Sequence, residues 1–127
     1  MKAILKQPGQ RPAAVEMENT LQALQKAVGG YIETVRITSD ACLICNEEGR
    51  LMGLESNPVM GIGLVGPVLC VGVNGDAFCS LTDENAEFLL RQIRQVFALE
   101  PDVAYRYQAV VSQQAHGGFQ QRTLSAA

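Results

Sequence analysis

The pattern of apolar and polar residues at the start of the chain predicts two short strands. The first strand covers Lys2 to Lys6, and the second covers Ala13 to Met17. Pro8-Gly9 lies between them and favours a turn, because proline fixes φ and glycine accepts a positive φ. We therefore expect an N-terminal hairpin.

Apolar residues recur at helical spacing in the next segment. Leu21, Leu24 and Val28 would lie on one face of a helix. Asn19 offers a side-chain oxygen as the N-cap, and Gly29-Gly30 follows where a left-handed C-cap is favoured. These signals predict a helix that begins after Asn19 and ends before the glycine pair.

A longer helical pattern follows Thr82. Thr82 is the expected N-cap, and Asp83 and Glu84 place negative charge in the first turn, where it complements the helix dipole. The apolar stripe of this helix consists of Ala86, Leu89, Leu90, Ile93 and Phe97.

Between the two helices the pattern is that of strands. Tyr31 to Ile37 alternates, and Ala41 to Cys45 is apolar on both faces, as in a central strand. After a turn at 46–49, Arg50 to Leu54 is expected to return as a paired strand. Residues 55–66 are rich in glycine and predict a long loop of a kind that is often functional.

A second hairpin is expected after this loop. Val68 to Val73 and Ala77 to Leu81 are its strands, and Asn74-Gly75 is a strong signal for the turn between them. The predicted order is ββαββ(β)ββα, in which the bracketed strand is Arg50 to Leu54. This order corresponds to an α+β fold with a mostly antiparallel sheet and two helices.

Composition agrees with one folded domain. The chain has 127 residues, of which 47% are hydrophobic and 18% are charged, as in a protein with a buried core. We assign residues 1–97 to a single α+β domain and residues 98–127 to a C-terminal tail or extra helix.

Charge and hydropathy narrow the range of partners. The net charge of −3 provides no basic surface for a phosphate backbone, so nucleic acid is an unlikely partner. No apolar run has the length of a signal peptide or a membrane span. We therefore expect a cytoplasmic protein without a membrane partner, in which the four cysteines are reduced thiols.

No complete catalytic or metal-binding pattern is present in the sequence. Cys42 and Cys45 have the spacing of half a zinc site, but residues three apart in a strand point to opposite faces. The glycines from Gly61 to Gly66 have the spacing of a dinucleotide-binding motif. That motif needs a strand before the glycines and a helix after them, whereas here a loop precedes them and a strand follows. We predict no catalytic residue, no metal site and no cofactor.

Four residues remain as candidate ligand-binding residues: Tyr31, Glu33, Asn46 and Asn57. If the strand face of Glu33 is buried, its carboxyl needs a partner or a raised pKa, whereas on an open face it is a ligand contact. Asparagine at a turn commonly bonds to its own backbone, so Asn46 and Asn57 also have a structural interpretation.

The chain resembles a family of small uncharacterised domains from phages, plasmids and conjugative elements of gut-type bacteria. The likeness covers residues 1–97 and implies a phage or mobile-element setting, without implying an activity. The segments that carry it are Met1-Lys-Ala-Ile-Leu5, Glu18 to Glu33 with its Gly-Gly-Tyr-Ile-Glu end, Cys45-Asn-Glu-Glu-Gly49, Asn57-Pro58 and Phe78-Cys-Ser-Leu-Thr-Asp-Glu84.

These observations lead to three hypotheses on function. The first is a non-enzymatic accessory or binding protein of a mobile element that acts on a protein partner. The alternative is a small-ligand-binding or sequestering domain that uses the four candidate residues around a pocket. The third, a nucleotide or peptide hydrolase, depends on Glu33 as its base. Edge strands of a small sheet also make a homodimer possible.

Overall fold

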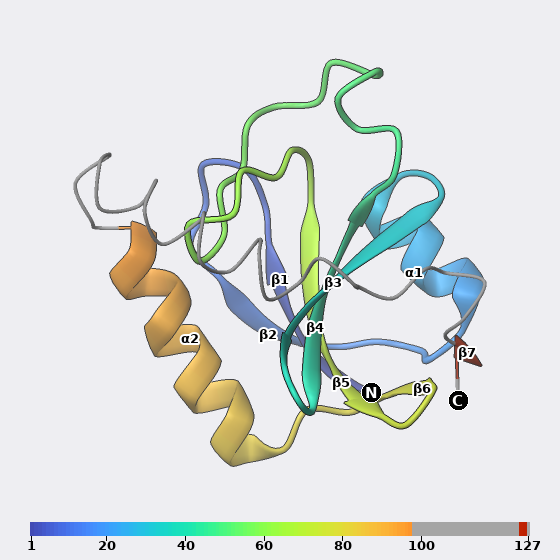
Figure 1. Ribbon diagram of the computed structural model, residues 1–127, viewed down its shortest axis with the longest axis vertical. Coiled ribbons are helices and arrows are strands. Elements are labelled where there is room, and N and C mark those ends of the chain that lie inside the picture. Colours follow the sequence, from blue (N-terminus) through green and yellow to red (C-terminus); the bar gives the residue numbers. More distant parts are fainter. Residues whose placement is uncertain (98–124, 127) are drawn as a thin grey trace.

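One sheet forms the middle layer of the molecule, with a helix against each of its faces (Figure 1). The computed structural model describes residues 1–97 and 125–126. The predicted α+β class and the order of helices and strands are confirmed, except that the bracketed strand does not form. The interpretation of residues 98–127 as a tail or extra helix lies outside the described residues, apart from the short strand at 125–126.

The sheet is antiparallel except for its last, two-residue strand. Its central path runs β2-β1-β5-β4-β3; β6 also pairs with β5, and β7 pairs in parallel with β6. The strands are β1 (Lys2–Lys6), β2 (Ala13–Glu16), β3 (Ile32–Thr38), β4 (Ala41–Asn46), β5 (Val68–Asn74), β6 (Ala77–Cys79) and β7 (Ser125–Ala126).

Both predicted hairpins form. β1 pairs with β2 in the register Lys2↔Glu16, and β5 pairs with β6 in the register Asn74↔Ala77. Gly75 has a φ of 63°, which is the left-handed conformation that a two-residue hairpin turn requires. β1 then lies against β5, so the N-terminal hairpin extends the sheet on the side opposite to β3.

Helix α1 (Leu21–Val28) has Thr20 as its N-cap, so the prediction of Asn19 is wrong. The Thr20 hydroxyl accepts a hydrogen bond from the Ala23 backbone N–H at 3.1 Å. Asn19 instead donates from its side chain to the backbone carbonyl of Phe78 and ties the start of the helix to β6. Both residues can cap, and the tertiary contact to β6 decides between them. Gly29 provides the predicted left-handed C-cap with a φ of 80°.

Helix α2 (Asp83–Phe97) begins as predicted, because the Thr82 hydroxyl accepts a hydrogen bond from the Asn85 backbone N–H at 3.1 Å. Ala86, Leu89 and Ile93 are buried on its inner face. The side chain of Phe97, the last member of the predicted stripe, lies outside the described residues. No helix in the described part of the chain combines the length and apolar character needed to span a bilayer.

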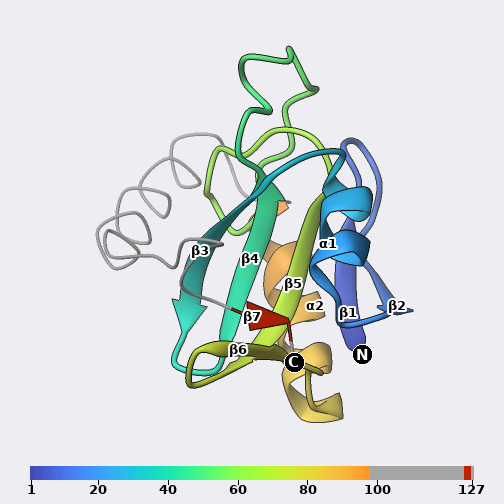
Figure 2. The ribbon, with the colours of Figure 1, turned by 90° about the vertical axis from the view of Figure 1, so that its right-hand side faces the viewer.

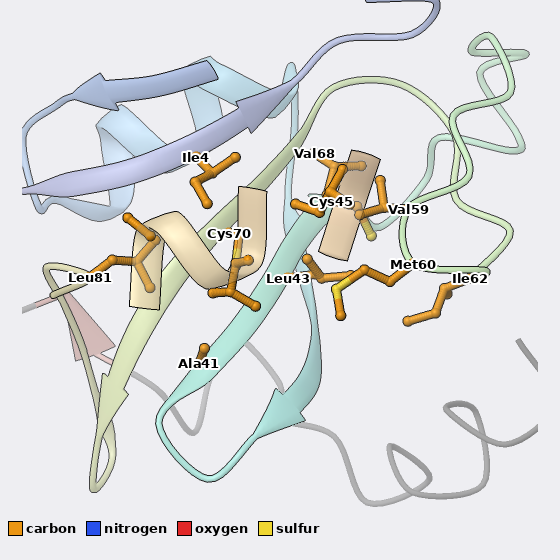
Figure 3. Packing of buried hydrophobic residues seen from close by; sticks show 13 residues of the cluster. Ile4, Ala41, Leu43, Cys45, Val59, Met60, Ile62, Val68, Cys70 and Leu81 are labelled. Carbon is orange, nitrogen blue, oxygen red and sulfur yellow. The ribbon is translucent and has the colours of Figure 1, made fainter. Parts of the chain in front are cut away.

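Alternation along the central strands creates a hydrophobic cluster on each face of the sheet. In Figure 2, α1 covers one face and α2 the other. Figure 3 shows the α2 side, where side chains from β1, β4, β5 and the long loop meet. Cys45 and Cys70 belong to this cluster, whereas Cys42 belongs to the cluster beneath α1. Cys42 and Cys45 thus point to opposite faces and cannot ligate the same ion.

The prediction of a strand at Arg50–Leu54 is wrong, because residues 47–53 form a tight series of turns. The backbone N–H of Met52 donates to the Glu48 carbonyl, and that of Leu54 donates to the Gly49 carbonyl, so these groups have no strand partner. Gly49 lies within this turn series and is tightly packed, because a Cβ atom there would lie only 2.7 Å from the Val65 side chain. A residue larger than glycine would therefore require a shift of its neighbours.

The long loop predicted at 55–66 is present and folds back on itself. Isolated bridges join Ser56 to Val65 and Val59 to Ile62. Val59, Met60 and Ile62 are buried against the α2 side of the sheet. In Figures 1 and 2, the segment between β4 and β5 extends beyond one end of the sheet.

Candidate functional site

Asn46 lies at the end of β4, and two surface hollows share it as a lining residue. Its side chain is 4% exposed. The amide Nδ2 donates to the Val28 carbonyl at 3.1 Å and contacts the Met52 sulfur at 3.5 Å, and Oδ1 accepts from the Glu48 backbone N–H at 2.9 Å. Asn46 therefore joins the end of α1 to the turn at 47–53. Its polar atoms are engaged in this structural role.

The first hollow lies between the ends of β3 and β4 and the long loop. We call it the acidic hollow, because Glu33 and Glu47 line it and both are exposed. Arg50 also lines it, with its guanidinium donating to the Gly63 carbonyl. Its volume is about 250 Å³. Its remaining lining residues are Val35, Cys45, Asn46, Leu51, Gly63, Leu64 and Val65.

The second hollow lies between the C-terminal end of α1 and the turn at 47–53. We call it the Tyr31 hollow; its volume is about 270 Å³. Tyr31 is 60% exposed and Met52 is 53% exposed, so both side chains stand at its edge. Gln25, Gly29, Gly30, Asn46 and Glu48 complete its lining.

Three large apolar side chains that line the two hollows are exposed. Leu51 is 90% exposed at the turn and lines the acidic hollow, while its neighbour Met52 lines the Tyr31 hollow. We call Tyr31, Leu51 and Met52 together the apolar ridge. Leu51 and Met52 are not among the residues predicted from the sequence, because the predicted strand at Arg50 to Leu54 includes both. The available signal was an apolar pair flanked by Gly49 and Gly53, which favours a turn over a strand.

Asn57 lines neither the acidic hollow nor the Tyr31 hollow. Its side chain is 1% exposed, and its Nδ2 donates to the backbone carbonyls of Lys6 at 2.8 Å and Gly66 at 2.7 Å. Its Oδ1 accepts from the Lys6 ammonium at 3.0 Å. Burial lowers the pKa of Lys6 below its ordinary value of 10.5. Asn57 thus fastens the long loop to β1.

The four candidate residues therefore do not gather around one cavity. Glu33 and Asn46 share the acidic hollow, Tyr31 and Asn46 share the Tyr31 hollow, and Asn57 is buried elsewhere. Of the two alternatives for Glu33, the structure has the exposed carboxylate.

A third hollow of about 390 Å³ lies between α1 and the N-terminal hairpin. Mostly apolar side chains line it, from both the sheet and the helix. They are Leu5, Val15, Met17, Ala23, Ala27 and Leu69, with Gln7 and Lys26 as the polar members.

The thiols of the central strands are poor nucleophiles. Burial raises the pKa of Cys42 and of Cys45 from 9.0 to about 12, and it also raises the pKa of Cys70. A protonated thiol neither attacks an electrophile nor ligates a metal readily. Within residues 1–97, no three His, Cys, Asp or Glu side chains gather in a way that could hold a metal ion.

Comparison with known families identifies a family for this chain but no activity. A family model described as a domain of unknown function, DUF3846, matches residues 1–97. The chain belongs to this family. No curated protein and no solved structure matches the chain. The resemblance to a family of small uncharacterised domains is thereby confirmed.

The DUF3846 match covers both hollows and the apolar ridge. All four candidate residues and the turn at 47–53 lie within it. The surface described above is therefore part of the DUF3846 domain itself.

Proposed function

We propose that this domain is a non-enzymatic accessory protein of a phage or another mobile element and that it binds a protein partner. The observation that carries this proposal is the apolar ridge, in which Tyr31, Leu51 and Met52 are 60%, 90% and 53% exposed. A single exposed apolar residue is ordinary, but adjacent large ones mark interaction surfaces. Tyrosine and methionine are also enriched in the centres of protein interfaces.

The setting of this function is part of the same proposal. The resemblance to domains of phages, plasmids and conjugative elements supports a mobile-element protein that acts on a protein of the host or of the element. The free thiols of Cys42, Cys45, Cys70 and Cys79 fit a reducing compartment such as the bacterial cytoplasm. A homodimer through an edge strand stays a prediction, which analytical ultracentrifugation tests.

The two other hypotheses have less support. Small-molecule sites usually have volumes of roughly 300–1,000 Å³, whereas the two hollows lined by candidate residues have about 250 and 270 Å³. The third hollow, of about 390 Å³, falls in this range, but none of the four candidate residues lines it. A hydrolase would need two titratable groups in unlike environments. Glu33 and Glu47 share the acidic hollow, but both carboxylates are exposed and so lack that difference.

Affinity capture with matched variants tests the proposed surface. The wild-type domain, the double variant Leu51→Ser/Met52→Ser and the control Phe88→Ser are each used to capture proteins from bacterial lysates, with and without phage infection. Phe88 is a suitable control because it is 48% exposed on α2, away from the ridge. We expect the same partner with the wild type and the control, at a much lower yield with the double variant. Equal recovery by all three proteins, or none by any, would contradict the proposal.

A further inference from the structure

The charges around the apolar ridge are mostly negative. Glu33 and Glu47 line the acidic hollow together with Leu51, and Glu48 lines the Tyr31 hollow together with Tyr31 and Met52. All three side chains are exposed. The ion pairs found among the described residues lie elsewhere, at the N-terminus with Glu16 and between Lys2 and Asp83.

Arg50 is the one basic side chain among the residues that line these two hollows. Its guanidinium donates to the Gly63 carbonyl, and this bond directs it to the wall formed by the long loop. Three carboxylates therefore face the solvent beside the ridge with one arginine as a counter-charge. A partner that covers the ridge must approach these carboxylates.

Charge complementarity then specifies the partner. An acidic or neutral segment would gain nothing from the three carboxylates, and an acidic one would be repelled. A lysine or arginine side chain would be attracted to the acidic hollow. An arginine could also stack on the exposed face of Tyr31, because its cation interacts favourably with an aromatic ring. The apolar part of the affinity would come from contact with Leu51 and Met52.

We propose that the ridge and its carboxylates bind a basic segment of a partner protein, in which arginine or lysine alternates with large apolar residues. This proposal rests on the proposed function and adds the chemistry of the partner. Apolar side chains of the segment cover Leu51 and Met52, and its cations reach Glu33, Glu47 and Glu48. The ridge supplies most of the affinity, while the carboxylates supply selectivity and faster association.

Peptide arrays test this inference directly. The probes are immobilised peptides in which leucine and phenylalanine alternate with arginine, with serine or with glutamate. We expect the full-length protein to be retained by the arginine peptides, less by the serine peptides and least by the glutamate peptides. Retention by the arginine peptides should fall as sodium chloride is raised, because salt screens exposed charges.

Variants with matched charge changes separate the ridge from general electrostatics. The variant Glu33→Gln/Glu47→Gln/Glu48→Gln should bind the arginine peptides about tenfold more weakly. The control Glu18→Gln/Glu84→Gln/Glu87→Gln removes the same charge from exposed positions elsewhere and should bind like the wild type. Urea unfolding of both variants checks that each remains folded.

The outcomes distinguish this inference from the proposed function. Equal loss of binding in the charge variant and its control would overturn the inference, as would retention by serine or glutamate peptides as strong as by arginine peptides. If Leu51→Ser/Met52→Ser abolishes that unselective binding, the ridge is still a protein-binding surface. If the double variant binds every peptide as the wild type does, the ridge itself is wrongly assigned. A protein that no peptide retains also contradicts the inference, whereas the proposed function is then decided by the capture experiment.

Discussion

Lys6 and Asn57 are joined by two hydrogen bonds that connect the first strand to the long loop. The Lys6 ammonium donates to Asn57 Oδ1 at 3.0 Å, and Asn57 Nδ2 donates back to the Lys6 carbonyl at 2.8 Å. Both side chains are buried, with exposed fractions of 2% and 1%. Buried charge is tolerated where hydrogen bonds replace water, so this pair is a structural anchor for the loop beside the apolar ridge.

The anchor predicts that Asn57→Ala is strongly destabilising. The substitution removes an acceptor from the buried Lys6 ammonium and a donor from the carbonyls of Lys6 and Gly66. Hydrogen bonds to buried charged groups are worth about 1.5–3 kcal/mol, so we expect the free energy of unfolding to fall by about 2–4 kcal/mol. Urea unfolding measures this change. Gln22→Ala, which removes an exposed amide on α1, should stay within about 0.5 kcal/mol of the wild type. A comparable loss in both variants would refute the anchor.

The buried thiols predict that the protein loses stability in alkali. Burial raises the pKa of Cys45 from 9.0 to about 12, so the folded state keeps a proton that the unfolded state releases. The stabilisation from this thiol is complete below pH 9.0 and declines as the pH rises towards about 12. The free energy of unfolding of the wild type, relative to that of Cys45→Ala, should therefore fall by about 1.4 kcal/mol for each pH unit above the unfolded-state pKa.

Urea unfolding of both proteins from neutral pH to about pH 10 measures this linkage. The difference between the two proteins isolates Cys45, because every other titrating group, Lys6 included, is common to both. The control Val71→Ala also removes buried side-chain atoms but no proton. The difference in free energy of unfolding between Val71→Ala and the wild type should not change with pH. A constant difference for Cys45→Ala as well would show that this thiol has no raised pKa.

Local patterns in the sequence were sufficient to predict most of the fold. Period-two alternation at 31–37 identified β3, and the apolar character of Ala41–Cys45 identified a central strand. These signals succeed because burial on one or both faces dictates side-chain polarity directly. The strand predicted at Arg50–Leu54 is wrong because the prediction gave more weight to the apolar residues Leu51 and Met52 than to the glycines on either side of them, Gly49 and Gly53.

The candidate site was likewise predicted only in part from the sequence. Of the four residues predicted from the sequence, Tyr31, Glu33 and Asn46 line the two hollows, whereas Asn57 does not. Their residue types mark turns and strand ends, but the direction of each side chain depends on tertiary contacts. Asn57 is directed inwards by Lys6, which is far from it in the sequence.

Separate substitutions of Thr20 and its neighbour Asn19 test which residue caps α1. Thr20→Ala removes the hydroxyl that accepts from the Ala23 backbone N–H, and it should lower the free energy of unfolding by about 1 kcal/mol. Thr20→Ser keeps the acceptor and should be close to the wild type. Asn19→Asp also keeps the side-chain acceptor that a capping role for Asn19 would use, but it removes the donor to the Phe78 carbonyl. Thermal unfolding should show a lower Tm for Asn19→Asp. A Tm equal to that of the wild type would support Asn19 as a cap instead.

Gly30 and Asn46 should be energetically coupled, because a Cβ atom at Gly30 would lie 2.9 Å from Asn46 Nδ2. Gly30→Ala should push the amide away from the Val28 carbonyl and lower the free energy of unfolding by about 1–3 kcal/mol. Asn46→Ala should also be destabilising, since it leaves the Glu48 backbone N–H without its acceptor. In the double variant the added methyl group fills space that the amide has vacated. The free energy of unfolding should therefore fall less in the double variant than the sum of the decreases in the two single variants, by at least about 0.5 kcal/mol. A double-mutant cycle in urea measures this coupling, and strict additivity would show that the close approach of Gly30 to Asn46 has no energetic consequence.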